Sequence, residues 1–193
     1  MSIGVDEVGR GCIAGDLVVC AFRLKADLDE AARRDFFSLA MDSKAFRSRK
    51  AREKAAVIMR EAGEFEVVRA TPQEIDALNI RGATLWAMQE AATRLIARTG
   101  RAKVYFDGKD CPDGFQGEGE AVIKGDSKVP EISAASIIAK TLRDAEMDEA
   151  AKLYPVYGFE KHAGYGTAQH RLAIAERGLC PLHRSWARKF LAG

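Results

Sequence analysis

Two apolar, β-branched segments near the start of the chain, at residues 3–6 and 17–24, are joined by a turn that is rich in glycine. Such segments favour β-strands, and a glycine-rich turn between them predicts two strands of one sheet. Two carboxylates, Asp6 and Glu7, come at the end of the first segment, directly before the turn. The chain is therefore expected to build a sheet that carries acidic side chains at the end of an apolar strand.

Beyond this pair, the pattern alternates strands with helices. The predicted strands cover residues 65–70, 102–107 and 120–124, and the predicted helices cover residues 48–62, 83–99, 131–152 and 168–177. The tetrapeptide Thr71-Pro72-Gln73-Glu74 combines a capping threonine, an early proline and a capping-box glutamate, so it predicts a further helix start. In the helix over 48–62, Val57 and Ile58 are expected to face inward, and Gly63 to end it. This order predicts an α/β fold, a mixed sheet flanked by helices with a helical C-terminal part.

The composition is that of a folded globular protein. The chain has 193 residues, of which 47% are hydrophobic and 30% charged, and this balance excludes a disordered or collagen-like chain. We expect one domain over residues 1–193, because domains of roughly 100–200 residues are usual. No apolar run reaches the ~18 residues of a membrane helix, and the early acids argue against a signal peptide. The expected compartment is therefore the cytoplasm.

The four cysteines support the same compartment. Cys12, Cys20, Cys111 and Cys180 show neither CxxC spacing nor the density of a disulfide framework. We expect reduced thiols, as is usual for cytosolic proteins.

The formal net charge of +2 hides an uneven distribution. Residues 44–54 contain six basic residues and one acidic residue, and so do residues 161–193. Acidic residues gather between them, over residues 107–120. Two basic zones around an acidic one suit a protein that binds phosphates next to a metal site, although ordinary solvated surfaces give the same counts.

The turn after the first strand allows two interpretations. Gly9-x-Gly11-x-x-Ala14 imitates a dinucleotide-binding fingerprint, but that fingerprint opens a helix, whereas residues 17–24 form a predicted strand. Alternatively, Asp6 and Glu7 bind a hard cation such as Mg²⁺, with the turn offering backbone N–H groups to a phosphate. Neighbouring strand residues point to opposite faces, so both carboxylates reach one metal only where the strand ends or bends. A solvated acidic turn is the remaining alternative.

The segment Gly4-Val5-Asp6-Glu7-Val8-Gly9-Arg10-Gly11, followed by Ala14-Gly15, resembles the N-terminal signature of the ribonuclease HII family. Further matches follow in order, to about residue 186. They are Asp42-Ser43-Lys44, Leu78-Asn79, Ala83-Thr84-Leu85 through Met88, Tyr105-Phe106-Asp107-Gly108, residues 124–140 with Arg143-Asp144, residues 162–167, and His183-Arg184-Ser185. Cys12 and Asp16 stand where the family usually has prolines. Ala45-Phe46-Arg47 also departs from the family pattern after Lys44.

The resemblance implies an RNase H-like fold and a metal-dependent endoribonuclease. Its members cut the RNA strand of RNA–DNA hybrids and nick duplex DNA 5′ of an embedded ribonucleotide, leaving a 3′-hydroxyl and a 5′-phosphate. The family's four carboxylates map onto Asp6, Glu7, Asp107 and Asp126, and imply two Mg²⁺ or Mn²⁺ ions. The residues agree, because Asp107 ends a predicted strand and Asp126 follows one. Asp144 is expected to be a helix-surface charge.

The same resemblance implies which residues recognise the substrate. Gly9, Arg10, Gly11 and Tyr165 match the family's ribose-sensing residues. Contacts to DNA phosphates are expected from Ser43, Lys44 and the basic helix from Ser48, and from the basic tail with Arg184. Residues from about 150 to 193 are expected to form a helical substrate-binding segment. The three histidines, His162, His170 and His183, lack zinc-ligand spacing and are expected at the surface or in hydrogen bonds.

The expected partners are RNA–DNA hybrids and DNA duplexes that contain ribonucleotides, bound by a monomer without a membrane. A catalytically silent hybrid-binding module is the alternative from another class of protein. It is disfavoured because a protein that only binds does not need the four carboxylates.

Overall fold

A computed structural model describes residues 2–42 and 48–191. Its centre is a five-stranded sheet in the order β3-β2-β1-β4-β5. The strands are β1 (Ser2–Val8), β2 (Leu17–Leu24), β3 (Gly63–Ala70), β4 (Lys103–Asp107) and β5 (Gly119–Val122). β1, β2 and β3 pair antiparallel, whereas β4 runs parallel to β1 and β5 parallel to β4. The predicted mixed sheet is confirmed.

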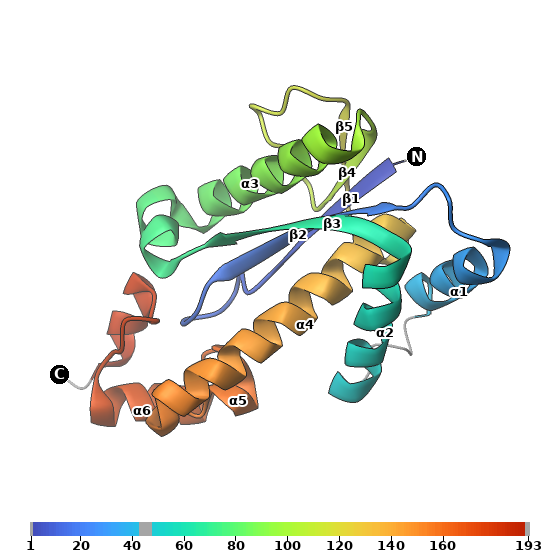
Figure 1. Ribbon diagram of the computed structural model, residues 1–193. Coiled ribbons are helices and arrows are strands. Elements are labelled where there is room, and N and C mark those ends of the chain that lie inside the picture. Colours follow the sequence, from blue (N-terminus) through green and yellow to red (C-terminus); the bar gives the residue numbers. More distant parts are fainter. Residues whose placement is uncertain (1, 43–47, 192–193) are drawn as a thin grey trace.

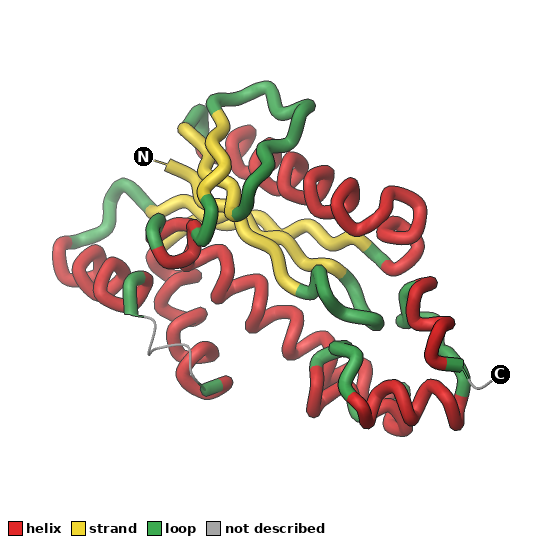
Figure 2. Tube along the Cα trace, turned by 180° about the vertical axis from the view of Figure 1, so that it is seen from behind, coloured by secondary structure: helices red, strands yellow, loops and turns green. Residues whose placement is uncertain are grey.

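Helices cover both faces of this sheet (Figure 1). α3 (Pro72–Thr99) covers one face, and α1 (Glu30–Ala40), α2 (Arg49–Ala62) and α4 (Pro130–Leu153) lie on the other. The short helix η1 (Gly125–Ser127) leads into α4. The C-terminal part gathers at the far end of α4 and consists of η2 (Pro155–Tyr157), α5 (Phe159–His162), α6 (Ala168–Arg177) and η3 (Ser185–Phe190) (Figure 2). Within the described residues, no helix is long and apolar enough to cross a membrane.

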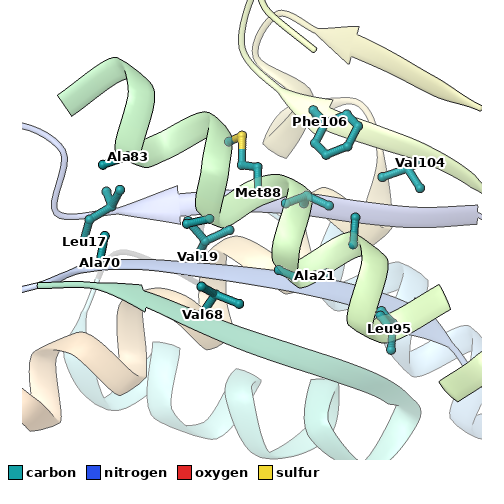
Figure 3. Packing of buried hydrophobic residues seen from close by; sticks show 14 of the residues in the cluster. Leu17, Val19, Ala21, Val68, Ala70, Ala83, Met88, Leu95, Val104 and Phe106 are labelled. Atoms are coloured by element: carbon teal, nitrogen blue, oxygen red, sulfur yellow. The ribbon is translucent and has the colours of Figure 1, made fainter. Parts of the chain in front are cut away.

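The central strands are apolar on both faces because helices cover both. In β2, Leu17 and Val19 point toward α3 and pack with Met88 of that helix (Figure 3). The alternate residues Val18 and Phe22 pack on the opposite side with α1, α2 and α4. This two-sided burial explains the nearly continuous apolar run from 17 to 24.

Local sequence signals set the helix boundaries. Thr71 accepts a hydrogen bond from the Glu74 N–H while the Glu74 carboxylate accepts one from the Thr71 N–H, which is the predicted capping box. α3 runs on from there to Thr99, with a break at Asn79, whose φ is 56°. α2 begins after Ser48 and ends at Gly63, as predicted.

The predicted inner face of α2 is wrong. Val57 and Ile58 are 54% and 39% exposed, and the helix packs inward through Met59 and a set of alanines. Small side chains let α2 lie close to its neighbours, and this packing outweighs the larger apolar residues. α1 was not predicted, because its sequence is rich in charge; Asp29 caps its start by accepting from the Ala32 N–H.

Gly4 marks the closest approach between β1 and α4. A Cβ at this position would overlap backbone atoms of Glu131 and Ile132 at the start of α4. Backbone cannot move aside as a flexible side chain can. The absence of a side chain at Gly4 therefore fixes the distance between the sheet and α4.

We expect Gly4→Ala to lower the free energy of unfolding by at least the ~1–3 kcal/mol typical of overpacking. Urea denaturation measures this. Gly82→Ala is the matched control, because a Cβ there would make only an ordinary contact, 3.5 Å from the Leu78 Cβ, inside α3. Alanine at that helical position should stabilise by about 0.5–1 kcal/mol. Equal effects of the two substitutions would contradict this account of Gly4.

Candidate active site

Three carboxylates meet where β1 and β4 end. The two strands are parallel neighbours, with Val5 opposite Phe106, so the residues that follow, Asp6 and Asp107, come side by side at one edge of the sheet. Carboxylate oxygens of Asp6, Glu7 and Asp107 all lie within 4.8 Å of one another. The structure thus brings together three of the four predicted carboxylates.

Asp6 and Glu7 reach this point from opposite faces of the strand. Asp6 lies on the α4 side, the side of Ser136, whereas Glu7 follows the alternation toward α3. Both can turn toward Asp107 because the strand ends at Val8 and Gly9 follows with a φ of 90°. The edge of the sheet, and not one of its faces, is therefore where the carboxylates converge.

Burial and mutual repulsion raise the pKa values of Asp6 and Glu7. Burial raises the pKa of Asp6 well above its usual range, and the charges of Glu7 and Asp107 raise it further. The Ser136 hydroxyl and the Glu7 N–H, 2.7 Å from the Asp6 Oδ1, partly oppose this rise. Burial also raises the pKa of Glu7, against the pull of Arg10, whose Nη1 lies 3.5 Å from the Glu7 Oε1. A cation bound among these oxygens would offset both the cost of burying the charged carboxylates and their mutual repulsion.

The donor set fits a hard divalent cation. Among the described residues, the Glu7 Oε2 is buried and has no hydrogen-bond partner. An unpartnered buried carboxylate oxygen is costly unless a cation or water satisfies it. Mg²⁺ and Mn²⁺ prefer carboxylate oxygen ligands. Asp6, Glu7 and Asp107 are the residues that would hold such an ion.

Asp126 lies outside this group of three. It is exposed on η1, one residue after Gly125, whose N–H donates to the Asp107 Oδ1 at 2.6 Å. The preceding Lys124 adopts a left-handed φ of 55°, which turns the chain back toward β4. Gly125 thus links Asp126, the predicted fourth carboxylate, to the site, while the Asp126 side chain faces solvent.

The turn after β1 contacts the loop that carries Tyr165. The Gly164 carbonyl accepts from the N–H groups of Ile13 and Ala14, at 2.9 and 3.3 Å. Tyr165 is 43% exposed, and its ring lies 3.9 Å from where a Cβ on Gly11 would be. The predicted ribose-sensing residues therefore adjoin one another, directly beyond the carboxylate strand.

Arg184 does not face solvent as a phosphate contact would. It is fully buried, and its guanidinium donates to the carbonyls of Gly15, Cys12 and Arg10 at 2.8–3.3 Å. Burial lowers the pKa of Arg184 to about 10. The prediction that Arg184 binds DNA phosphate is wrong because the turn after β1 uses all of these donors. Its role is to hold that turn.

Arg143 is a second buried guanidinium, for which the sequence predicts no role. It donates to the carbonyls of Asp16, Ala14 and Ala163 at 2.9, 2.9 and 2.6 Å. One side chain thus joins the turn after β1 to the Tyr165 loop. Residues 140–149 are rich in charge, so no local signal marks this arginine as buried.

Other predicted surface residues are also buried. Asp144 is 9% exposed and forms ion pairs with Lys140 and Arg52, at 2.6 and 3.4 Å, so its prediction as a helix-surface charge is wrong. The three histidines are buried and hydrogen bonded. The prediction that they lie at the surface is therefore wrong, and the alternative prediction, that they form hydrogen bonds, is confirmed. Ser43 and Lys44 lie outside the described residues.

Two grooves meet at Tyr165. One runs between α2, α4 and α5, and its charged lining residues are Arg49, Arg52, Lys140 and Lys161 together with Asp144, Asp148 and Glu160. The other lies toward the C-terminus, where Gly11 and Tyr165 adjoin Arg171, Trp186, Lys189 and Phe190. Basic and aromatic side chains in this arrangement suit a nucleic-acid backbone. The basic residues of α2 and of the C-terminal part belong to the two basic zones expected from the sequence, whereas Lys140, Trp186 and Phe190 were not predicted. Ser136 beside Asp6 was not predicted either; a hydroxyl within the apolar stretch 132–139 was the available signal.

Metal-dependent phosphodiester hydrolases use carboxylates to hold metal ions at the scissile phosphate. Here such carboxylates stand at the ends of adjoining strands, with the two grooves beside them. On this mixed sheet they define a protein of the ribonuclease H class. More narrowly, the chain belongs to the ribonuclease HII family of endoribonucleases, whose model, Ribonuclease HII, matches residues 3–190.

Individual relatives agree with this family. The chain is 45% identical to a ribonuclease HII of Halorhodospira halophila over 182 residues, which cover 94% of this chain and 89% of that one. It is 42% identical to the ribonuclease HII of Neisseria meningitidis serogroup C over 184 residues, covering 95% and 90%. Among solved structures, the PCNA:RNase HII complex from Archaeoglobus fulgidus matches with a TM-score of 0.77 and 27% identity, covering 98% of this chain and 94% of that one.

Asp6→Asn should stabilise the metal-free protein. A carboxyl group whose pKa is raised by folding destabilises the native state once it ionises, so the penalty is present at pH 8 and fades as the pH falls and the group is protonated. Removing the charge should raise the free energy of unfolding by about 1 kcal/mol or more. In a protein of this size, each kcal/mol corresponds to an increase in Tm of roughly 2–4 °C.

Thermal unfolding in EDTA at pH 8 and at pH 5 measures this difference, which should be smaller at pH 5. Mn²⁺ added at pH 8 should raise the Tm of the wild type more than that of the variant. Equal shifts with Mn²⁺ would argue against Asp6 as a metal ligand.

Proposed function

We propose that this protein is a divalent-metal-dependent endoribonuclease that hydrolyses the RNA strand of RNA–DNA hybrids and nicks duplex DNA on the 5′ side of an embedded ribonucleotide. The products are a 3′-hydroxyl and a 5′-phosphate. The observation that carries the proposal is the gathering of Asp6, Glu7 and Asp107 directly before the turn that contacts Tyr165. Membership of the ribonuclease HII family supports it.

The carboxylates hold the cations and orient the scissile phosphate. Two bound divalent ions supply the chemistry that carboxylates lack, namely activation of a water molecule and neutralisation of charge on the phosphate and leaving oxygen. Asp6, Glu7 and Asp107 keep their oxygens at fixed positions because they stand on strand ends. We assign Asp126 as the fourth carboxylate, which joins when substrate is bound; the Gly125–Asp107 hydrogen bond supports this by holding it nearby.

The turn and Tyr165 recognise the ribose. Gly9 needs to be glycine for the fold, because its φ is 90° and a Cβ would overlap the Arg143 side chain. The fold does not require glycine at position 11: among the described residues, only Tyr165 lies within 4 Å of where a Gly11 Cβ would be, at 3.9 Å. A glycine that the fold does not require leaves its backbone open to a ligand, and the Tyr165 hydroxyl can bond to a 2′-OH.

The basic grooves position the duplex. Contacts to phosphates fix register and orientation without reading sequence. Arg49, Arg52, Lys140 and Lys161 would take this part, in place of the buried Arg184, with the first three exchanging Asp148 or Asp144 for phosphate oxygens. We further propose that residues 1–193 act as one catalytic domain and as a monomer, in which residues from about 150 onward form the substrate-binding segment. Support comes from Arg143 and Arg184, which tie that segment to the turn.

The decisive experiment uses a DNA duplex that contains one ribonucleotide, incubated with Mg²⁺, with Mn²⁺ and with EDTA. We expect metal-dependent nicking on the 5′ side of the ribonucleotide. Asp6→Asn and Asp107→Asn should each reduce the rate by more than the ~10–100-fold typical of groups that only support a metal ligand. Asp35→Asn, an exposed acid on α1, is the matched control and should retain full activity.

Other outcomes select other functions. Activity in EDTA, or equal cutting of an all-DNA duplex, would contradict the proposed function as a metal-dependent endoribonuclease. Tight binding of the hybrid without any cleavage would instead support the catalytically silent hybrid-binding module.

Gly11→Ala separates the recognition role from the fold. The variant should unfold at the wild-type urea concentration, because the new Cβ makes only an ordinary contact in the protein. Its KM for the ribonucleotide-containing duplex should rise roughly 10–100-fold, since a small misplacement of substrate costs that much in rate or binding. Gly9→Ala, two residues away, should instead lose stability. A Gly11→Ala enzyme with unchanged kinetics would show that the backbone at this position does not meet the substrate.

A further inference from the structure

Three buried histidines lie behind the exposed ring of Tyr165. His162, His170 and His183 come from α5, from α6 and from the segment before η3, and none is more than 9% exposed. The rings of His162 and His170 stack with their centres 4.4 Å apart, and the Nε2 atoms of His170 and His183 lie 3.1 Å apart. The ribonuclease chemistry proposed above uses none of these side chains.

The hydrogen bonds fix where each proton of the His170–His183 pair sits. The Tyr165 carbonyl can only accept, so the His170 Nδ1, 2.9 Å away, carries a proton. The Cys180 N–H can only donate, so the His183 Nδ1, 2.9 Å from that nitrogen, carries a lone pair. The Nε2–H of His183 then donates to the bare Nε2 of His170. The farther Cys180 carbonyl, at 3.3 Å, receives no proton from His183 in this arrangement.

Both imidazoles are neutral in this chain of bonds. A proton added to His170 would place two N–H groups against each other between the Nε2 atoms, and one added to His183 would place its Nδ1–H against the Cys180 N–H. The environment agrees, because burial lowers the pKa of His170 to about 4 and also lowers the pKa of His183. The chain therefore runs in one direction, from the Cys180 N–H through both rings to the carbonyl of Tyr165.

Tyr165 receives this chain at its backbone carbonyl, while its side chain is 43% exposed beside Gly11. Its carbonyl also accepts from the Thr167 N–H at 2.8 Å, and its own N–H donates to the His162 carbonyl at 2.9 Å. His162 in turn accepts from the Gly164 N–H through Nδ1 and donates to the Tyr157 carbonyl. The backbone on either side of Tyr165 is thus held by imidazoles.

Packing alone does not account for such a network. Tyr157 and Phe159 surround the rings, and aliphatic side chains would fill the same space without the cost of burying polar groups. Buried polar networks that are fully satisfied select a single arrangement of the chain. The arrangement selected here is that of the one residue in the loop whose ring reaches toward Gly11.

We propose that the His170–His183 pair is a positioning element, which fixes the Tyr165 backbone and thereby sets how strongly the site distinguishes a ribonucleotide from a deoxyribonucleotide. This inference rests on the proposed role of Tyr165 in ribose recognition. His170 and His183 act through Tyr165 and do not touch the substrate.

The protonation pattern can be measured without any activity. In the full chain labelled with ¹⁵N-histidine there are three imidazoles, and long-range ¹H–¹⁵N spectra report which nitrogen of each carries the proton. We expect the Nδ1–H tautomer for His170 and the Nε2–H tautomer for His183 at pH 7. The reverse tautomers, or a charged ring in either residue, would overturn the proposed chain of bonds.

The functional part uses two amide variants of His170. In His170→Asn the side-chain NH₂ takes the place of Nδ1 and can still donate to the Tyr165 carbonyl; in His170→Gln it reaches the Nε2 position instead. The readout is the Ki of an uncleaved all-DNA duplex divided by the KM of a duplex with one ribonucleotide, in Mg²⁺. Thermal unfolding of both variants checks that they fold.

We expect His170→Gln to lower this ratio by about 3–10-fold, the range that one neutral hydrogen bond supplies, and His170→Asn to keep it near the wild-type value. In a Tyr165→Ala background neither variant should change the ratio further, because a positioning residue acts only through its target. Equal ratios for the two variants, or a further loss without the Tyr165 ring, would overturn the inference.

The two proposals fail in different ways. If Tyr165→Ala lowers the ratio but His170→Gln does not, the positioning role is wrong and the ribose role of Tyr165 stands. If Tyr165→Ala leaves the ratio unchanged, the ribose role is wrong and the positioning role falls with it.

Discussion

Two guanidinium groups that lie in the interior, bonded to backbone carbonyls, hold the catalytic edge of the sheet together. Arg143 and Arg184 are at most 1% exposed, and together they bind carbonyls of the turn after β1 and of the Tyr165 loop. Burying such a charge is costly unless hydrogen bonds replace its water. Here the replacement comes from a turn that must keep its carbonyls pointed inward. The same bonds that solvate the arginines therefore shape the turn that follows Asp6 and Glu7.

This arrangement explains why residues far apart in sequence form one site. β1 contributes two carboxylates, its parallel neighbour β4 contributes the third, and α4 closes over them at Gly4. The C-terminal part adds Tyr165, held against the turn by Arg143 on one side and by the histidines on the other. The metal-binding half and the sugar-contacting half are thus built by different parts of the chain and joined through backbone carbonyls.

Features with a local signal could be predicted from the sequence. The capping box at Thr71 and the strands that carry Asp6 and Asp107 follow from short patterns, and parallel pairing then brings the two carboxylates together, although β1 continues past Asp6 to Val8. Features that depend on tertiary packing could not. Nothing local distinguishes a buried Arg184 from an exposed arginine, or marks Asp144 as the partner of Lys140 and Arg52. The alanine face of α2 was likewise missed, because close packing rewards small residues over Val57 and Ile58.

The reactivity of the Cys12 thiol reports on the contact between the turn after β1 and the Tyr165 loop. Its thiol is fully buried, 3.6 Å from the Ala163 carbonyl, and burial raises its pKa. A thiol in that state resists alkylation, because only an accessible thiolate reacts. The loop must leave the turn before a reagent can reach the sulfur. The rate of Cys12 labelling therefore counts how often the C-terminal part detaches from the sheet, which is a measure of local opening taken without any substrate.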